Sequence, residues 1–260
     1  MLKNRVVVIT GASSGLGSEL ALLFAQKGAI VVLLARNEKR LTEIKQQINS
    51  EGGRAFSMTL DITKSEAVSD VFRKIEDQFG IIDICINCAG YGQFQRFTEM
   101  TDQSIEHMFK VNVLGLIACS KAALPLLLKG ERKQLVNIAS MAGKVTTPKS
   151  IVYGATKHAV IGFSDGLRME LENEGLRVLV VNPGPIRTPF LNIADPSGHY
   201  VESAGRFLLE PHHVAERVFN AIERNKRELN LPWYMAIGAK LFQITPGIFV
   251  KFFGAFLKMK

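Results

Sequence analysis

The stretch from Val6 to Gly28 constrains the fold more than any other part of the chain. Residues 6–10 form a continuous β-branched run, typical of a parallel strand buried on both faces. A glycine-rich turn and a segment with helical apolar spacing follow it. Glycines let a pyrophosphate approach the backbone, and a helix N-terminus offers free N–H groups, so this order predicts a dinucleotide phosphate site. The turn residues are Gly11, Ala12, Ser13, Ser14, Gly15, Leu16 and Gly17. The plain alternative is a tight strand–helix turn.

The same alternation of strand and helix continues along the chain. Apolar runs predict six more strands, at residues 30–34, 55–60, 81–88, 135–139, 177–181 and 228–231. Helical spacing lies between them, at residues 39–50, 64–79, 102–128, 151–173 and 211–225. We find no linker and no internal repeat. The pattern predicts one domain over residues 1–260, an α/β, three-layer, doubly wound Rossmann fold with a parallel seven-stranded sheet.

The end of the second strand bears on the choice of dinucleotide. A carboxylate normally holds the ribose 2′-hydroxyl there, about 20 residues past the glycines. This chain has Ala35-Arg36-Asn37 instead, with Arg40 one helical turn further on. No acid is present to repel a 2′-phosphate, and a guanidinium is available to bind it. The pattern favours NADP(H) over NAD(H), and the alternative is a solvated arginine at a helix start.

Three residues in the middle of the chain predict acid–base chemistry. Tyr153 and Lys157 are four residues apart in a predicted helix, so both side chains leave the same face. We expect the ammonium to lower the pKa of the phenol toward working pH. Ser140 ends the preceding strand and could hold a carbonyl or alcohol oxygen beside the phenol. Alone, this triple is weak support for a site.

Other strand ends carry residues suited to the same ligand. Asp61 and Ile62 follow the third strand, where a carboxylate could meet an adenine amino group. Small residues at the fourth strand end would let a nicotinamide ribose pack there; the run is Asn87, Cys88, Ala89 and Gly90. Asn112 is a polar amide among apolar neighbours, so we expect it to have a hydrogen-bond partner.

Together these motifs resemble the short-chain dehydrogenase/reductase family in its single-domain branch. The matching pieces run from residue 6 to residue 188 in the family's order: Thr10 to Gly17, Asp61, Asn87 to Gly90, Asn112, Ser140, Tyr153, Lys157, Pro183 and Gly184. The resemblance implies that Tyr153 donates or accepts the proton. It implies that Lys157 binds the nicotinamide ribose and lowers the tyrosine pKa, and that Ser140 orients the substrate oxygen. Cys88 departs from the pattern, since the family usually has a second asparagine there.

The resemblance also implies further roles and an activity. Asn112 would hold a water in the proton relay, and Ile186 and Thr188 would contact the carboxamide. We expect an NADP(H)-dependent oxidoreductase that moves a hydride between nicotinamide and a carbonyl or secondary alcohol. The implied assembly is a homodimer or homotetramer, in contact through helix 102–128 and the Tyr153 helix. The alternative is a non-catalytic NADP(H)-sensing binding protein.

Composition and cysteine spacing narrow the kinds of partner, metal site and cellular location that we expect. Lys and Arg exceed Asp and Glu by 32 to 24, but there is no basic run, so we expect no nucleic-acid partner. Cys85 and Cys88 are three apart in a strand and point to opposite faces, so we predict buried thiols and no metal site. The amino end leaves no room for a signal peptide, and no window offers about 20 uncharged apolar residues. We expect a cytoplasmic protein.

The C-terminal third is where substrate identity should lie. Residues 189–210 predict a flexible substrate lid, and residues 233–260 an apolar extension broken at Thr245-Pro246-Gly247. Phenylalanines 249, 252, 253 and 256 share one helical face, and no acid follows Glu228. We expect the extension to pack against a partner subunit and wall an apolar site for a lipid- or steroid-like carbonyl. The alternative is peripheral contact with a membrane surface.

Overall fold

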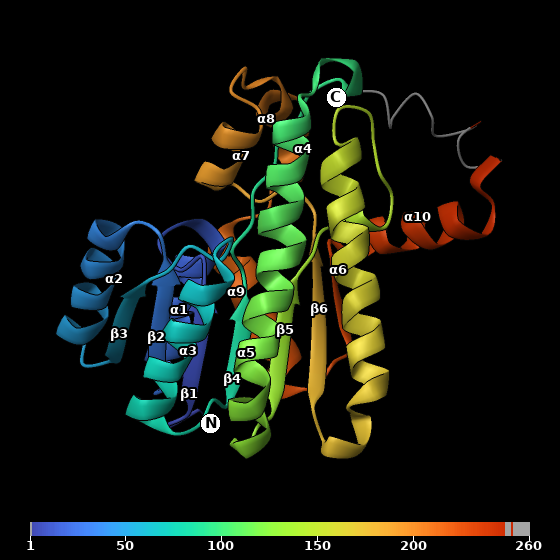
Figure 1. Cartoon of the computed structure of the whole chain (residues 1–260). Helices are drawn as coiled ribbons and strands as arrows, with labels where there is room; N and C mark the ends of the chain where they lie inside the picture. The colour runs from blue at the N-terminus through green and yellow to red at the C-terminus, as the bar shows by residue number, and fades with distance from the viewer. Residues whose placement is uncertain (1, 248–250, 252–260) are drawn as a thin grey trace.

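The computed structural model describes residues 2–247 and 251. Its strands form one parallel sheet in the order β3-β2-β1-β4-β5-β6-β7, which confirms the predicted doubly wound α/β fold. The strands are β1 (Val6–Thr10), β2 (Ile30–Ala35), β3 (Arg54–Thr59), β4 (Ile84–Asn87), β5 (Gln134–Ile138), β6 (Arg177–Pro183) and β7 (Glu228–Leu231). Every carboxyl end therefore meets the same edge of the sheet (Figure 1).

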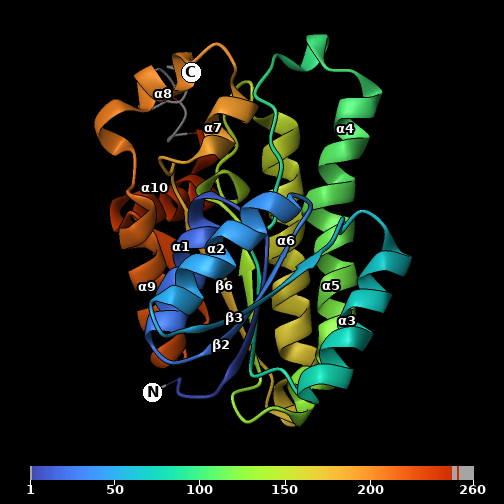
Figure 2. The same cartoon turned by 90° about the vertical axis from the view of Figure 1, so that its left-hand side faces the viewer.

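Helices cover both faces of this sheet and make the three layers (Figures 1 and 2). One face carries α3 (Ser65–Phe79), α5 (Leu116–Lys129) and α6 (Ile151–Glu170). The other carries α1 (Gly15–Gln26), α2 (Glu38–Ser50) and α9 (Pro211–Glu223). Because β1 has apolar residues on both sides, Val7 and Ile9 enter one core while Val6 and Val8 enter the other.

Cys85 and Cys88 lie on opposite faces of the sheet, as predicted, but Cys88 is only partly buried. Cys85 belongs to the core beneath α3 and α5, whereas Cys88 packs against the core beneath α1 and α9. All three cysteines are free, and burial raises the pKa of the Cys88 thiol to about 12. Thiols on opposite faces of a sheet are in no position to act as a pair.

The helix predicted at 102–128 is not regular along its length. It consists of α4 (Asp102–Phe109), a π-helical segment (Lys110–Gly115) and α5. The side chain of Ile62 packs against Gly115, where an added Cβ would lie 2.8 Å from it. By length and composition alone, the helical stretch Asp102–Lys129 could cross a membrane, since an 18-residue window within it has a mean hydropathy of 1.9. Half of that window, however, is buried inside the domain.

The predicted lid contains two short helices, α7 (Pro189–Ala194) and α8 (His199–Ala204). After β7 the chain forms α10 (Trp233–Ile244), which ends just before Thr245, so the predicted break is confirmed. The stripe of phenylalanines 249, 252, 253 and 256 lies outside the described residues.

Candidate active site

The three central candidates come together at the carboxyl edge of the sheet. Ser140 follows β5, and α6 brings Tyr153 and Lys157 beside it. The turn between them can lie close to α6 because Gly143 has no side chain; a Cβ there would be 2.8 Å from the Lys157 carbonyl carbon. Ser140 Oγ accepts a hydrogen bond from the Ala142 N–H at 3.1 Å, which fixes the serine at the start of this turn.

Tyr153 is hydrogen-bonded to Ser140, but its pKa differs from the sequence prediction. Burial raises the pKa of the phenol above its ordinary value, and the Ser140 hydrogen bond only partly offsets this. The expected lowering by Lys157 is therefore wrong for this structure. The physical reason is desolvation, because a buried phenolate loses its water.

Lys157 is also buried, and it points toward the strand end. Its Nζ donates to the carbonyl of Ile138 at 2.8 Å and lies 5.7 Å from the centre of the Tyr153 ring. Burial lowers the pKa of this lysine to about 8. A Cβ added to Gly90 would lie 3.7 Å from Nζ, so the ammonium lies close to the end of β4.

Asn112 has the hydrogen-bond partners that its burial requires. Its Oδ1 accepts from the Tyr91 N–H at 2.8 Å, and its Nδ2 donates to the Tyr91 carbonyl at 2.7 Å and to Thr156 Oγ1 at 3.0 Å. The π-helical segment therefore joins the loop after β4 to α6. A role for Asn112 in holding a water stays a prediction.

The glycine turn has the shape that a dinucleotide needs. Gly11 and Gly15 have positive φ values of 69° and 56°, and a Cβ at Gly17 would lie 2.2 Å from the Gly11 carbonyl oxygen. Ser14 caps α1 without a side-chain hydrogen bond, and the first turn contains no acid. The helix N–H groups there suit a phosphate. The Thr188 side chain lies over Gly15, 3.1 Å from the position that a Cβ on Gly15 would take. Thr188, the residue predicted to contact the carboxamide, is therefore beside the glycine turn.

Arg36 and Arg40 lie after β2 but differ in their surroundings. Arg40 is exposed and pairs with Glu43 at 2.8 Å. Arg36 is exposed and forms no ion pair with another described residue. Burial raises the pKa of Asp61, but two hydrogen bonds from Thr63 and the Arg36 charge leave it below its ordinary value. Arg36 and Asp61 are thus neighbours at the predicted adenosine end.

The remaining residues predicted to contact the dinucleotide lie at the carboxyl ends of β4 and β6 or just after them. The Asn87 amide nitrogen donates to Ser120 at 2.9 Å and to Asn137 at 2.9 Å, inside the sheet, and its Oδ1 is buried with no hydrogen-bond partner among the described residues. Thr10 Oγ1 accepts from the Ala89 N–H at 3.2 Å and fixes that strand end. Of the other predicted contacts, Pro183 ends β6, and Gly184 and Ile186 follow it at the same edge.

The sequence did not single out the aromatic residues around Tyr153. The Phe94 and Phe190 rings lie 5.6 and 5.7 Å from the Tyr153 ring, and the Tyr200 ring lies 4.9 Å from Phe94. Phe190 comes from α7 and packs on the phenol ring, and Tyr200 comes from α8 and packs on Phe94, so both short helices contribute to this cluster. Phe94 and Tyr200 also line a hollow of about 580 Å³. Only three-dimensional packing reveals this cluster, since its members are far apart in the chain.

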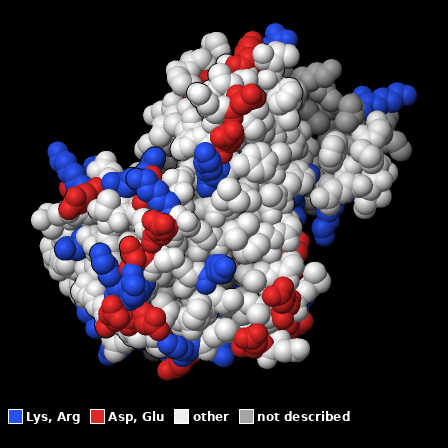
Figure 3. All heavy atoms as spheres, in the orientation of Figure 1, with Lys and Arg blue, Asp and Glu red and all other residues white. Residues whose placement is uncertain are grey.

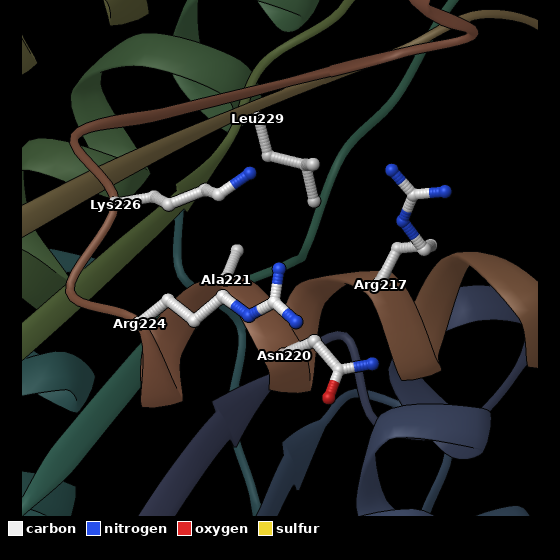
Figure 4. A pocket seen from close by; sticks show the side chains of 6 residues that line it. All are labelled: Arg217, Asn220, Ala221, Arg224, Lys226 and Leu229. Atoms are coloured by element: carbon white, nitrogen blue, oxygen red, sulfur yellow. The ribbon is translucent and has the colours of Figure 1, made fainter.

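A second hollow, of about 230 Å³, lies between α9 and β7 (Figure 4). Arg217, Arg224 and Lys226 line it, and their side chains are exposed. Lys226 and Leu229 lie at the amino end of β7, whereas the catalytic candidates follow carboxyl ends. This hollow is therefore not part of the candidate active site.

Comparisons with known proteins show which family the chain belongs to. The short chain dehydrogenase family model matches residues 5–196. An uncharacterized oxidoreductase of Staphylococcus epidermidis is 35% identical, over 85% of this chain and 92% of that protein. A second one, from Staphylococcus aureus, is 34% identical, over 87% and 94%.

Solved structures are similar over most of their length. An alcohol dehydrogenase from Thermococcus sibiricus, complexed with 5-hydroxy-NADP, is 29% identical with a TM-score of 0.79, over 88% of this chain and 96% of that one. A Burkholderia phymatum short chain dehydrogenase/reductase in complex with NAD has a TM-score of 0.87 over 95% of each chain; at 23% identity it shows the fold alone. The chain belongs to the short-chain dehydrogenase family, and it is an oxidoreductase of that type.

Proposed function

We propose that the protein is an NADP(H)-dependent reductase of an apolar carbonyl compound, or the corresponding alcohol dehydrogenase. The observation that carries this proposal is the hydrogen bond between Ser140 and Tyr153 at the same sheet edge as the glycine turn. A sensor of NADP(H) would have no need of a paired serine and tyrosine beside the nicotinamide end. Arg36, which is exposed and forms no ion pair within the described part of the chain, supports the choice of NADP(H).

In this mechanism NADPH, held by the glycine turn and Arg36, would supply a hydride for the carbonyl carbon. Ser140 and Tyr153 hold the carbonyl oxygen, and Tyr153 gives that oxygen its proton. Burial keeps the phenol protonated near neutral pH, which is the form that donates. The ammonium of Lys157 would then stabilise the phenolate until a proton returns.

The walls of the site support an apolar substrate. Phe94, Phe190 and Tyr200 surround Tyr153. Met235 of α10 packs against Gly184, and a Cβ added to that glycine would lie 3.2 Å from the methionine sulfur. Such walls favour a lipid- or steroid-like ketone over a sugar.

We also propose a homodimer through α4, α5 and α6. Phe109, Leu114 and Ile151 are exposed apolar residues of these helices and of the π-helical segment. Figure 3 shows that the surface over α5 and α6 carries few charges. Uncharged helical faces of this kind are typical of subunit contacts.

NADPH oxidation, measured against a panel of ketones, aldehydes and acyl thioesters, tests the activity. We expect turnover of apolar ketones or aldehydes by the wild type and loss of turnover in Tyr153→Phe. Tight NADPH binding without turnover of any compound would instead favour the sensor.

A further inference from the structure

Helix α10 presents an apolar face to solvent. Large apolar side chains recur along it at intervals of three or four residues: Trp233 is 70% exposed, Ile237 51%, Leu241 49% and Ile244 77%. Ala239, which is buried, falls on the opposite side of the helix. We call Trp233, Tyr234, Ile237, Leu241 and Ile244 the α10 face. A contiguous exposed apolar surface of this kind marks an interaction site.

The position of α10 makes this face a projecting surface. The helix leaves the sheet beside β7 and extends away from the body of the molecule, while α5 and α6 lie in front of the sheet (Figure 1). The proposed dimer contact is therefore on a different side. At its start, Met235 anchors α10 beside Gly184 at the carboxyl edge.

Charge indicates what covers the α10 face. No acid follows Glu228, but the chain has lysines at 240, 251, 258 and 260. Lys240, next to the α10 face, and Lys251 are both exposed. Trp233 and Tyr234 have the amphipathic rings that favour a membrane–water interface. The helix has 12 residues, too few to span a bilayer of about 30 Å.

We propose that the α10 face lies in the surface of an anionic lipid bilayer. Its apolar side chains enter the boundary between headgroups and acyl chains, and Lys240 and Lys251 bind the anionic headgroups. This arrangement holds the carboxyl edge of the sheet next to the bilayer. A membrane-dissolved carbonyl substrate then reaches the site directly; that consequence rests on the proposed function, whereas the membrane contact does not.

Co-sedimentation of the full chain with vesicles tests the proposal independently of activity. The wild type should bind vesicles of phosphatidylcholine and phosphatidylglycerol more tightly than vesicles of phosphatidylcholine alone. Ile237→Gln with Ile244→Gln should weaken binding by ~10-fold or more, because two apolar side chains no longer enter the bilayer. Met169→Gln with Phe97→Gln is the matched control, since these residues are 75% and 56% exposed elsewhere and should leave binding unchanged.

Two pairs of charge-removing substitutions test whether vesicle binding depends on the lysines near the α10 face or on the net positive charge of the whole protein. Lys240→Gln with Lys251→Gln should weaken binding to anionic vesicles by roughly fivefold per lysine. Arg217→Gln with Arg224→Gln removes the same charge from the hollow of Figure 4 and should change binding little. Unfolding curves and NADPH titrations check that each variant is folded.

Three results would overturn the proposal. The first is a wild type that binds neither vesicle, or both equally. The second is an isoleucine pair variant that still binds like the wild type. The third is a smaller oligomer for that variant in size-exclusion chromatography, which would make the α10 face a contact between copies of the chain.

Discussion

Lys157 donates a hydrogen bond from Nζ to the carbonyl oxygen of Ile138, at 2.8 Å, in the interior of the protein. Burial lowers the pKa of this ammonium from 10.5 to about 8. The unfolded chain binds the proton more tightly than the folded one. Burial of this ammonium therefore makes a destabilising contribution that is complete below about pH 8 and disappears as the pH rises toward 10.5.

The first prediction follows from this pKa difference. Between pH 7.5 and pH 10, the free energy of unfolding of the wild type should rise relative to that of Lys157→Met, by roughly 2 kcal/mol. Urea denaturation at both pH values, without cofactor, measures it. Parallel pH dependences for the two proteins would contradict the buried position of the ammonium.

NADPH binding and turnover should both fall in Lys157→Ala.

The second prediction concerns the cofactor. Arg36→Asp should weaken NADPH binding by ~10- to 150-fold, as expected for loss of a charge-assisted hydrogen bond of ~1.5–3 kcal/mol, and shift preference toward NADH. Arg40→Gln should have the smaller effect, because Arg40 already pairs with Glu43. Fluorescence titration gives the dissociation constants. Equal affinity of the wild type for NADPH and NADH would refute this assignment.

The third prediction concerns the π-helical segment. Asn112→Ala removes three hydrogen bonds and leaves the N–H and carbonyl of Tyr91 without these partners. We expect the free energy of unfolding to fall by about 2–3 kcal/mol. Urea denaturation at pH 7 measures the loss. A change below about 0.5 kcal/mol would show that water replaces the amide.

The fourth prediction concerns assembly. Leu114→Arg with Ile151→Arg places two charges on the proposed dimer face and should halve the mass measured by light scattering. Gln46→Arg, on exposed α2 behind the sheet, is the control and should leave the mass unchanged. A double variant that keeps the wild-type mass would place the subunit contact elsewhere.

Much of the fold could be predicted because its signals are local. The β-branched run of β1 and the glycines after it require a buried strand and a tight turn, whatever follows in the chain. The π-helical segment could not be predicted, because it depends on Ile62 packing at Gly115 and on Tyr91 bonding Asn112.

The residues that form the candidate site could be predicted from the sequence, but the directions of their pKa shifts could not all be predicted. The i, i+4 spacing placed Tyr153 and Lys157 on one face, and this is where the structure has them. Their pKa directions depend on burial, and Tyr153 is packed against Phe94 and Phe190, which come from other segments. Sequence spacing contains no information on such long-range packing, so the lowering of the tyrosine pKa was wrongly predicted.

The most direct test of the account is the turnover of Tyr153→Phe on a carbonyl compound that the wild type reduces. This substitution keeps the ring that packs against Phe94 and Phe190 and removes only the hydroxyl that bonds Ser140. We predict that kcat falls by ~100-fold or more while the dissociation constant for NADPH stays within about twofold of the wild type. Wild-type turnover by Tyr153→Phe would contradict the assignment of Tyr153 as the proton donor.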